Sequence, residues 1–171
     1  MEIERKFLMD AAFPQQLPLL EAAEVCQGYI AVQPVVRIRS KKAGAKTGYV
    51  LCFKGEGTIA RQETELDISE AVFHELAQLL EAPMIHKDYR VYALPDGHRL
   101  ECSCVDRGTD DEFWYAEVEF SSLEEAYAFT PPAFLGRDVT EEPGYGMSSH
   151  WVRKVSRYKG MRKGMEKSTD K

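Results

Sequence analysis

The sequence predicts an α+β fold in which an antiparallel β-barrel of eight strands is flanked by helices. Polar and apolar residues alternate along short segments, as they do in a half-buried strand. Short connections rich in turn residues, such as Pro95-Asp96-Gly97, join these segments and favour antiparallel hairpins. The 171 residues, of 19.4 kDa, correspond to one domain, and eight antiparallel strands are enough to close a barrel.

The first predicted strand covers residues 2–7, in which Glu2 and Glu4 alternate with apolar side chains. Residues 10–25 are rich in Ala, Leu and Glu, so we expect a short helix there, interrupted near its two prolines. The other strands are predicted at residues 27–32, 35–41, 49–54, 61–68, 85–94, 99–106 and 113–120.

Three further segments have the features of helices. Residues 69–80 open with a serine suited to an N-cap and repeat apolar residues at helical spacing. Residues 121–129 contain Ser122 and, three positions later, Glu125, which is the pattern of a capping box. Residues 148–158 place apolar side chains between charged ones, which also predicts a helix.

Charge is distributed unevenly along the chain. The net charge of −6 argues against nucleic acid as a partner, because a general nucleic-acid binder is basic. Residues 153–171 carry eight Lys or Arg and two acidic residues, which leaves the rest of the chain with a net charge of −12. We therefore predict a functional domain over residues 1–158 and a basic, disordered tail over residues 159–171.

The sequence also predicts where the protein resides. Its N-terminus is charged from the second residue, and no apolar run approaches the roughly 20 residues of a membrane span. Cys102-Ser103-Cys104 lacks the two-residue spacing that is typical of zinc sites. We therefore expect reduced cysteines, a cytoplasmic location and no membrane association.

The polar faces of the predicted strands carry charges in ordered sets. On any one strand such alternation is typical of a solvated face with cross-strand ion pairs. Because several strands share it, we expect these side chains to face the interior of the barrel, with apolar residues packed outward against helices. The charged residues are Glu2, Glu4, Lys6, Arg37, Arg39, Lys54, Arg61, Glu63, Glu65, Lys87, Arg99, Glu101, Glu117 and Glu119.

Such an interior predicts a particular chemistry. Carboxylates close together repel one another unless a cation lies between them, and their oxygens suit a hard divalent ion such as Mg2+ or Mn2+. Arg and Lys side chains that converge likewise repel unless a polyanion occupies the space, and phosphate oxygens match their donors. The two sets together predict a metal-assisted site for a polyphosphate.

The arrangement resembles that of a known family. Glu2-x-Glu4-x-Lys6 at the N-terminus resembles the ExExK signature of the CYTH superfamily, the triphosphate tunnel metalloenzymes. The order of the later charged segments is similar too, from Val36-Arg37-Ile38-Arg39 to Glu117-Val118-Glu119-Phe120. The resemblance covers roughly residues 1–155.

The resemblance implies an eight-stranded antiparallel tunnel whose members hydrolyse or cyclise triphosphates with Mg2+ or Mn2+. It implies catalytic roles for Glu4, Lys6 and Lys87. The implied metal ligands are Glu2, Glu4, Glu63, Glu65, Glu101, Glu117 and Glu119. The implied substrate-binding cations are Lys6, Arg37, Arg39, Lys54, Arg61 and Lys87.

Two positions depart from the family pattern. Tyr89 stands where the family commonly has an arginine, and Ser103 stands where it commonly has an acidic residue. By the period of a strand, Arg99 shares the face of Glu101. We therefore hypothesise that Arg99 supplies a substitute contact to phosphate, so that it joins the substrate-binding residues. The alternative is that Arg99 lies at the rim of the tunnel and pairs with a surface carboxylate.

The predicted function is the metal-dependent hydrolysis of inorganic triphosphate or a related small-molecule triphosphate. The small chain and the lack of a recognisable base-reading motif favour the inorganic substrate. Two alternatives remain open at this stage: an adenylate cyclase that converts ATP into cyclic AMP and pyrophosphate, and a non-catalytic polyphosphate-binding module. The sequence also leaves a homodimer open.

Overall fold

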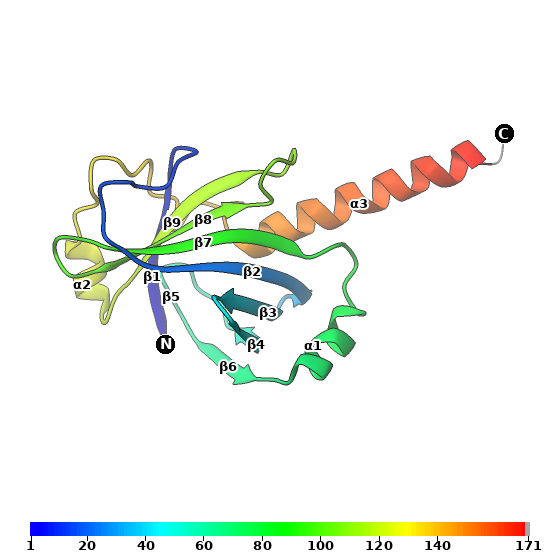
Figure 1. Ribbon diagram of the computed structural model, residues 1–171, viewed down its shortest axis with the longest axis horizontal. Coiled ribbons are helices and arrows are strands. Elements are labelled where there is room, and N and C mark those ends of the chain that lie inside the picture. Colours follow the sequence, from blue (N-terminus) through cyan, green and yellow to red (C-terminus); the bar gives the residue numbers. More distant parts are fainter. Residues whose placement is uncertain (170–171) are drawn as a thin grey trace.

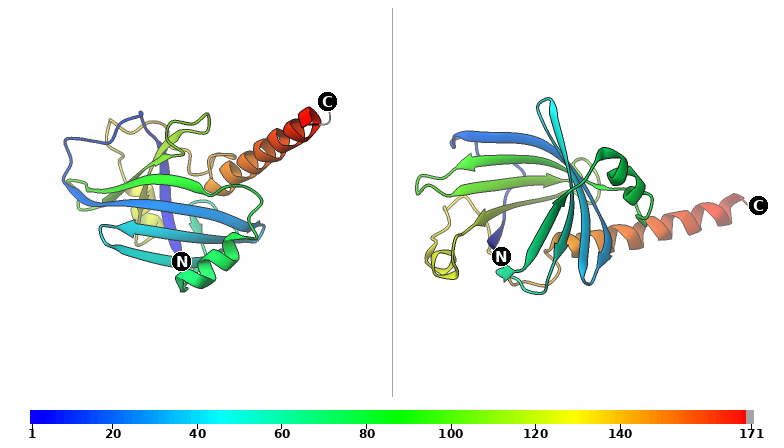
Figure 2. Two further views of the ribbon diagram at one scale, coloured as in Figure 1. Left: turned by 45° about the vertical axis from the view of Figure 1, so that its right-hand side comes forward. Right: turned by 90° about the horizontal axis from the view of Figure 1, so that it is seen from below.

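The computed structural model describes residues 1–169, which contain nine strands and three helices. The strands form one antiparallel sheet that curls into a nearly closed barrel (Figure 1; Figure 2). Their order across the sheet is β5-β1-β9-β8-β7-β2-β3-β4-β6. The strands are β1 Glu2–Leu8, β2 Leu19–Val32, β3 Val35–Ala43, β4 Lys46–Lys54, β5 Ala60–Arg61, β6 Glu63–Asp67, β7 Ile85–Ala93, β8 Arg99–Val105 and β9 Phe113–Glu119.

The antiparallel barrel is confirmed, with one more strand than the eight predicted. The extra strand arises because the segment predicted at residues 61–68 changes partner at Gln62. Before Gln62, β5 pairs with β1, and after it, β6 pairs with β4 at the opposite edge of the sheet. The Gly55 N–H donates to the Gln62 carbonyl at 2.8 Å. The chain itself therefore joins the two edges of the sheet.

The helix predicted at residues 10–25 is wrong. Residues 19–25 belong to β2, and residues 10–18 form turns and irregular chain. Ala23 and Val25 are buried, and β2 pairs with β7 as far as Gln27. The Ala, Leu and Glu content favours a helix locally, but pairing with β7 along this segment, joined by β3 from Glu24 onward, outweighs that propensity.

Two short helices cover the outside of the barrel and begin as predicted. In α1, Glu70–Ala77, the Ser69 hydroxyl accepts from the Val72 N–H at 3.2 Å. In α2, Leu123–Ala128, the Ser122 hydroxyl accepts from the N–H of Glu125 at 3.1 Å. These side chains satisfy N–H groups that have no partner inside the helix.

The third helix, α3, covers Met147–Thr169 and extends away from the barrel (Figure 1). Trp151 is buried beside the barrel, with Val155 and Tyr158 packed nearby. The predicted tail, residues 159–171, is therefore helical as far as Thr169, and residues 170–171 lie outside the described residues. Lys, Arg and Met are good helix formers and outweigh the two glycines of this stretch. None of the helices in residues 1–169 is long and apolar enough to cross a membrane.

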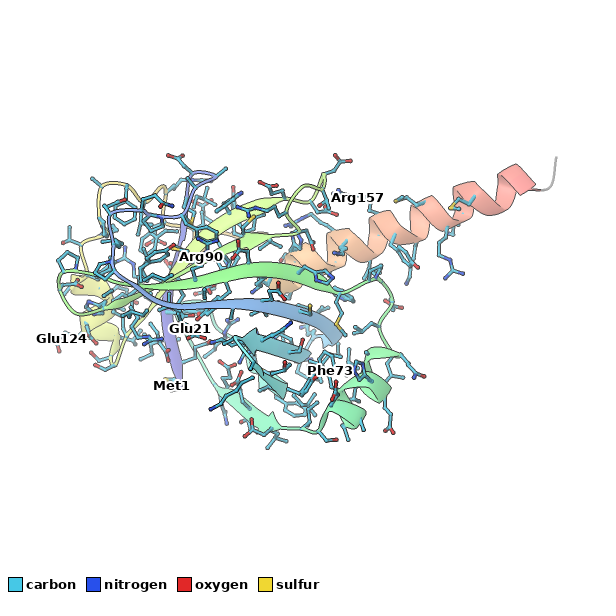
Figure 3. All side chains as sticks on the ribbon, viewed as in Figure 1. Met1, Glu21, Phe73, Arg90, Glu124 and Arg157 are labelled. Carbon is cyan, nitrogen blue, oxygen red and sulfur yellow. The ribbon has the colours of Figure 1, made fainter. Side chains whose placement is uncertain are left out.

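The barrel has its main apolar core on the outside, as the sequence predicted. Side chains extend from both faces of the sheet (Figure 3). Outward-facing residues of β1, β7, β8 and β9 pack beneath α2 and the chain before β2. This cluster contains Phe7, Leu100, Val118 and Phe129, among others. The apolar burial that stabilises the fold therefore leaves the interior available for polar groups.

Asp106 attaches α3 to the barrel. This buried residue follows β8 and has a positive φ of 45°. Its carboxylate accepts from the His86 N–H at 3.0 Å and from Lys154 Nζ at 2.9 Å, and lies 3.1 Å from His150 Nε2. Burial alone would raise the pKa of Asp106, but these bonds lower it to about 2.

We expect Asp106→Asn to lower the free energy of unfolding by about 2 kcal/mol at pH 7. A carboxylate whose pKa is lower in the folded state contributes stability above its unfolded pKa, and this is lost as the pH falls towards 2. Urea unfolding should therefore show that the difference in the free energy of unfolding between the variant and wild type becomes smaller below about pH 4. Asp110→Asn, at an exposed position of the same loop, is the control. Equal effects of the two substitutions would contradict this expectation.

Candidate active site

A cavity of about 680 Å3 lies inside the barrel. Its lining comes from inward-facing side chains of the strands and from residues 139–149, which precede and begin α3. The cavity brings together all but one of the predicted site residues. These are Glu2, Glu4, Lys6, Arg37, Arg39, Lys54, Arg61, Glu63, Glu65, Lys87, Glu101, Glu117 and Glu119.

Strand register gathers carboxylates on one side of the cavity. Glu4 of β1 lies opposite Glu119 of β9, and Glu117 of β9 lies opposite Glu101 of β8. Because alternate residues of a strand face the same side, all four side chains enter the cavity from three adjacent strands. We call Glu4, Glu101, Glu117 and Glu119 the carboxylate cluster.

The carboxylate cluster holds more carboxylates than cations, since Lys6 donates to Glu117 and Arg61 donates to Glu4. Burial, together with the negative charges of Glu117 and Glu2, raises the pKa of Glu4 to about 8, although Arg61 donates to it at 2.8 Å. Burial likewise raises the pKa of Glu101, with Glu117 and Glu119 contributing. Repelling carboxylates in a cavity offer the oxygen ligands that a hard divalent cation prefers. The donor set therefore fits such an ion.

Cations line the other side of the cavity. Arg37 and Arg39 of β3 lie 3.4 and 2.9 Å from Glu65. Lys54 of β4 lies 2.8 Å from Glu2 and 3.2 Å from Glu63. Both carboxylates of β6 are therefore paired with cations, whereas the four carboxylates of the carboxylate cluster share Arg61, 2.8 Å from Glu4, and Lys6, 2.9 Å from Glu117. An anion that enters the cavity on the side of β3 and β4 can replace Glu63 and Glu65 as the partner of these cations.

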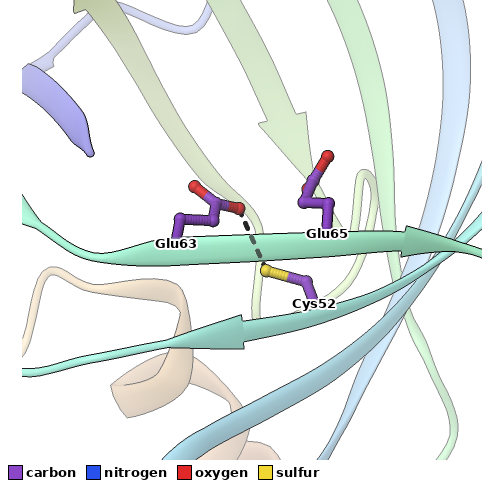
Figure 4. A group of neighbouring side chains, drawn as sticks. All are labelled: Cys52, Glu63 and Glu65. Carbon is purple, nitrogen blue, oxygen red and sulfur yellow. Dashed lines mark hydrogen bonds between the residues drawn. The ribbon is translucent and has the colours of Figure 1, made fainter.

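One group of residues offers ligand atoms within 4.8 Å of one another: Cys52, Glu63 and Glu65 (Figure 4). The Cys52 thiol donates to Glu63 Oε1 at 3.0 Å. Burial is the main reason that the pKa of this thiol is raised to about 11, so it stays protonated. Since both carboxylates also face cations, this group fits a metal ion less well than the carboxylate cluster does.

Lys87 differs from the other cations of the cavity. Burial in the barrel, with the positive charges of Lys6 and Arg37 nearby, lowers its pKa to about 7, although Glu117 opposes this. Its Nζ donates to the Tyr115 hydroxyl at 2.7 Å. At neutral pH, therefore, a large share of Lys87 is uncharged and able to accept a proton.

Tyr115 is a residue that our sequence analysis missed. It is buried between two lysines, since Lys6 Nζ lies 3.7 Å from the centre of its ring and Lys87 donates to its hydroxyl. Tyr115 precedes Glu117 by two residues, so the period of the strand would have placed it on the same inward face. The alternation of the strand would therefore identify Tyr115, whereas the charge pattern does not, because its side chain is neutral.

The strap formed by residues 136–146 was also missed. It runs beside β1, where the Leu8 N–H donates to the Arg137 carbonyl and the Val139 N–H donates to the Lys6 carbonyl. The Thr140 hydroxyl accepts from the Lys6 N–H at 2.9 Å. The sequence of this strap has no alternation or charge pattern that would have identified it.

Arg99 is a correction to the sequence analysis. It is not among the described residues that line the cavity, and its side chain is 58% exposed. Its Nη2 lies 3.8 Å from Glu21, at the end of β8. Strand period gave the correct face relative to Glu101, but Arg99 opens its strand and so lies at the rim of the barrel.

The two departures from the family pattern face each other. Tyr89 of β7 is the direct partner of Ser103 of β8, and both line the cavity. Burial is the main reason that the pKa of the Tyr89 hydroxyl is raised, and the negative charge of Glu101 adds to this. An expected cation and an expected anion are thus replaced together by two neutral groups, which leaves the charge balance of the cavity unchanged.

Comparison with known proteins agrees with this geometry. No protein-family model matches the chain. An inorganic triphosphatase of Nitrosomonas europaea is 37% identical over 145 residues, which cover 84% of this chain and 92% of the relative. The crystal structure of an inorganic triphosphatase matches 87% of this chain and 93% of its own, at 32% identity and a TM-score of 0.59.

A structure from Hippeastrum, described as an adenylyl cyclase with a dominant triphosphatase activity, has the same fold. It matches 74% of this chain and 83% of its own, with a TM-score of 0.52 and 17% identity, so it speaks for the fold alone. The inward charges, the barrel and the close relative agree with one another. The chain therefore belongs to the inorganic triphosphatases of the CYTH superfamily, the triphosphate tunnel metalloenzymes.

Proposed function

We propose that this protein hydrolyses inorganic triphosphate to pyrophosphate and phosphate with the help of a divalent cation, Mg2+ or Mn2+. The observation that carries the proposal is the division of one cavity into a carboxylate cluster and an opposing set of cations. The similarity to the Nitrosomonas europaea inorganic triphosphatase supports the same substrate. A small polyanion with its metal would complete both halves of the cavity at once.

In this proposal the carboxylate cluster holds the metal, with Glu2 beside it. When bound, a divalent cation neutralises charge on the phosphates and makes water more acidic. Glu63 and Glu65, which the sequence analysis included among the metal ligands, instead hold the side chains of Arg37, Arg39 and Lys54 in place before the substrate arrives.

The phosphates bind to the cations of the opposite side, Arg37, Arg39 and Lys54, and to those that enter the same cavity from β1, β5 and β7, which are Lys6, Arg61 and Lys87. Guanidinium groups match phosphate oxygens with two parallel donors, and the ammonium groups of Lys6 and Lys54 add point charges. Lys87, with its lowered pKa, accepts a proton from the attacking water. The substrate-binding set is Lys6, Arg37, Arg39, Lys54, Arg61 and Lys87.

No observation on the described residues favours an adenylate cyclase or a non-catalytic binding module over hydrolysis. The described lining of the cavity is dominated by charged side chains, which bind the phosphates of any triphosphate and do not read a base. The lowered pKa of Lys87 favours turnover over simple binding.

A functional domain over residues 1–158, a cytoplasmic location and a homodimer stay predictions.

The experiment that tests this function measures phosphate release from inorganic triphosphate and from ATP, with Mg2+ or Mn2+, alongside cyclic AMP formation. We expect rapid phosphate release from inorganic triphosphate, little from ATP, and none once EDTA is added. Cyclic AMP from ATP would instead assign a cyclase. Tight binding without release would assign a binding module.

Glu4→Gln should abolish turnover yet stabilise the metal-free protein. A carboxyl whose pKa is raised in the folded state contributes stability that is lost as the pH rises through about 8. The melting temperature of the variant, relative to wild type, should therefore increase between about pH 5 and pH 8. Added Mg2+ should stabilise wild type more than the variant. Glu75→Gln, exposed on α1, is the control, and a difference that does not change with pH would argue against this assignment.

Two arginines that the sequence analysis grouped together should behave differently. Arg39→Ala should raise the KM for inorganic triphosphate at least about tenfold, because it removes a charged donor from the cavity. Arg99→Ala should leave the KM within about twofold of wild type, since its side chain lies at the rim. Steady-state kinetics at saturating Mg2+ measures both. A large effect of Arg99→Ala would restore its predicted role.

A further inference from the structure

Gln27 is a buried polar residue of the cavity that the proposed function does not use. It lies on β2, is 0% exposed and lines the cavity. Its Nε2 donates to the Tyr29 hydroxyl at 3.2 Å. Its Oε1 has no hydrogen-bond partner among the described residues.

A buried acceptor without a partner is costly, and native proteins contain few of them. Replacing Gln27 with an apolar side chain of similar size would remove that cost. A stable barrel would therefore favour an apolar residue at this position, as at the neighbouring inward-facing Val25. The unpaired oxygen points to a group that is present only when the cavity is in use.

The surroundings of Gln27 limit what that group can be. Arg39 is its direct partner on β3. On β7 the direct partner is Ile85, and Lys87, two residues further along, is the diagonal neighbour. Gln27 therefore lies on the side of the cavity where phosphates would bind. An ionised phosphate oxygen carries no proton to donate and would repel Oε1. A water molecule can donate.

We propose that Gln27 Oε1 accepts a hydrogen bond from the water molecule that attacks the terminal phosphate, which makes Gln27 a catalytic residue. The inference rests on the proposed function. The water oxygen forms a bond to the terminal phosphorus, and the bond from that phosphorus to the bridging oxygen breaks. Pyrophosphate leaves with the electron pair, and the water proton passes to the uncharged Lys87 Nζ. Gln27 aims the water, and Lys87 takes its proton.

Gln27→Met tests this role, because Met fills a similar volume without a polar group. We expect kcat for inorganic triphosphate to fall at least about thirtyfold while KM stays within about threefold, since only the attacking water loses a contact. The melting temperature should be unchanged or higher, because an unsatisfied acceptor is gone. Gln27→Glu keeps an oxygen acceptor and should retain more of kcat than Gln27→Met does.

Gln16→Met, an exposed glutamine, is the matched control and should match wild type. A Gln27→Met variant with unchanged kcat would overturn the inference. A lower melting temperature with a loss of kcat that Gln27→Glu does not relieve would also overturn it, because that pattern assigns a structural role. Wild-type protein that releases no phosphate would overturn both the proposed function and the role of Gln27. If wild type is active, the Gln27 variants test the role of Gln27 alone.

Discussion

Burial of charge inside the barrel is the constraint on which the rest of this structure depends. A charged side chain can leave water only when an opposite charge or a ligand faces it. Glu2 illustrates the consequence, since it accepts from Lys54 of β4 and from Arg61 of β5. These bonds connect β1 to its neighbour β5 and to β4, which lies next to the opposite end of the sheet order. The charges that bind substrate in our proposal therefore also hold the barrel together.

The division of labour between the two faces of the sheet follows from this constraint. Apolar packing on the outside, beneath α2 and around the start of α3, stabilises the fold. The interior can then keep groups that are unfavourable in isolation, such as the carboxyl of Glu4 and the carbonyl oxygen of Gln27. Among the described residues, two of the three buried side-chain atoms that lack a hydrogen-bond partner, Gln27 Oε1 and Arg37 Nε, belong to residues that line the cavity.

Tyr89 and Ser103 show how such an interior can change without losing balance. Because they are direct neighbours across β7 and β8, a cation and an anion can be exchanged for neutral groups together. The carboxylate cluster and the arginines of β3 still line the same cavity.

The sequence by itself located the core of most strands and the direction in which their charges face, because alternation reports the two sides of a strand directly. Only the tertiary structure decided how deep each side chain lies. Arg99 and Glu101 share a face, yet one reaches the rim and the other the carboxylate cluster. Pairing with β7, a strand more than 60 residues away in the sequence, made residues 19–25 a strand against their helical composition. The unpaired oxygen of Gln27 emerged only once its neighbours were known, because hydrogen-bond satisfaction is a property of surroundings that lie far apart in sequence.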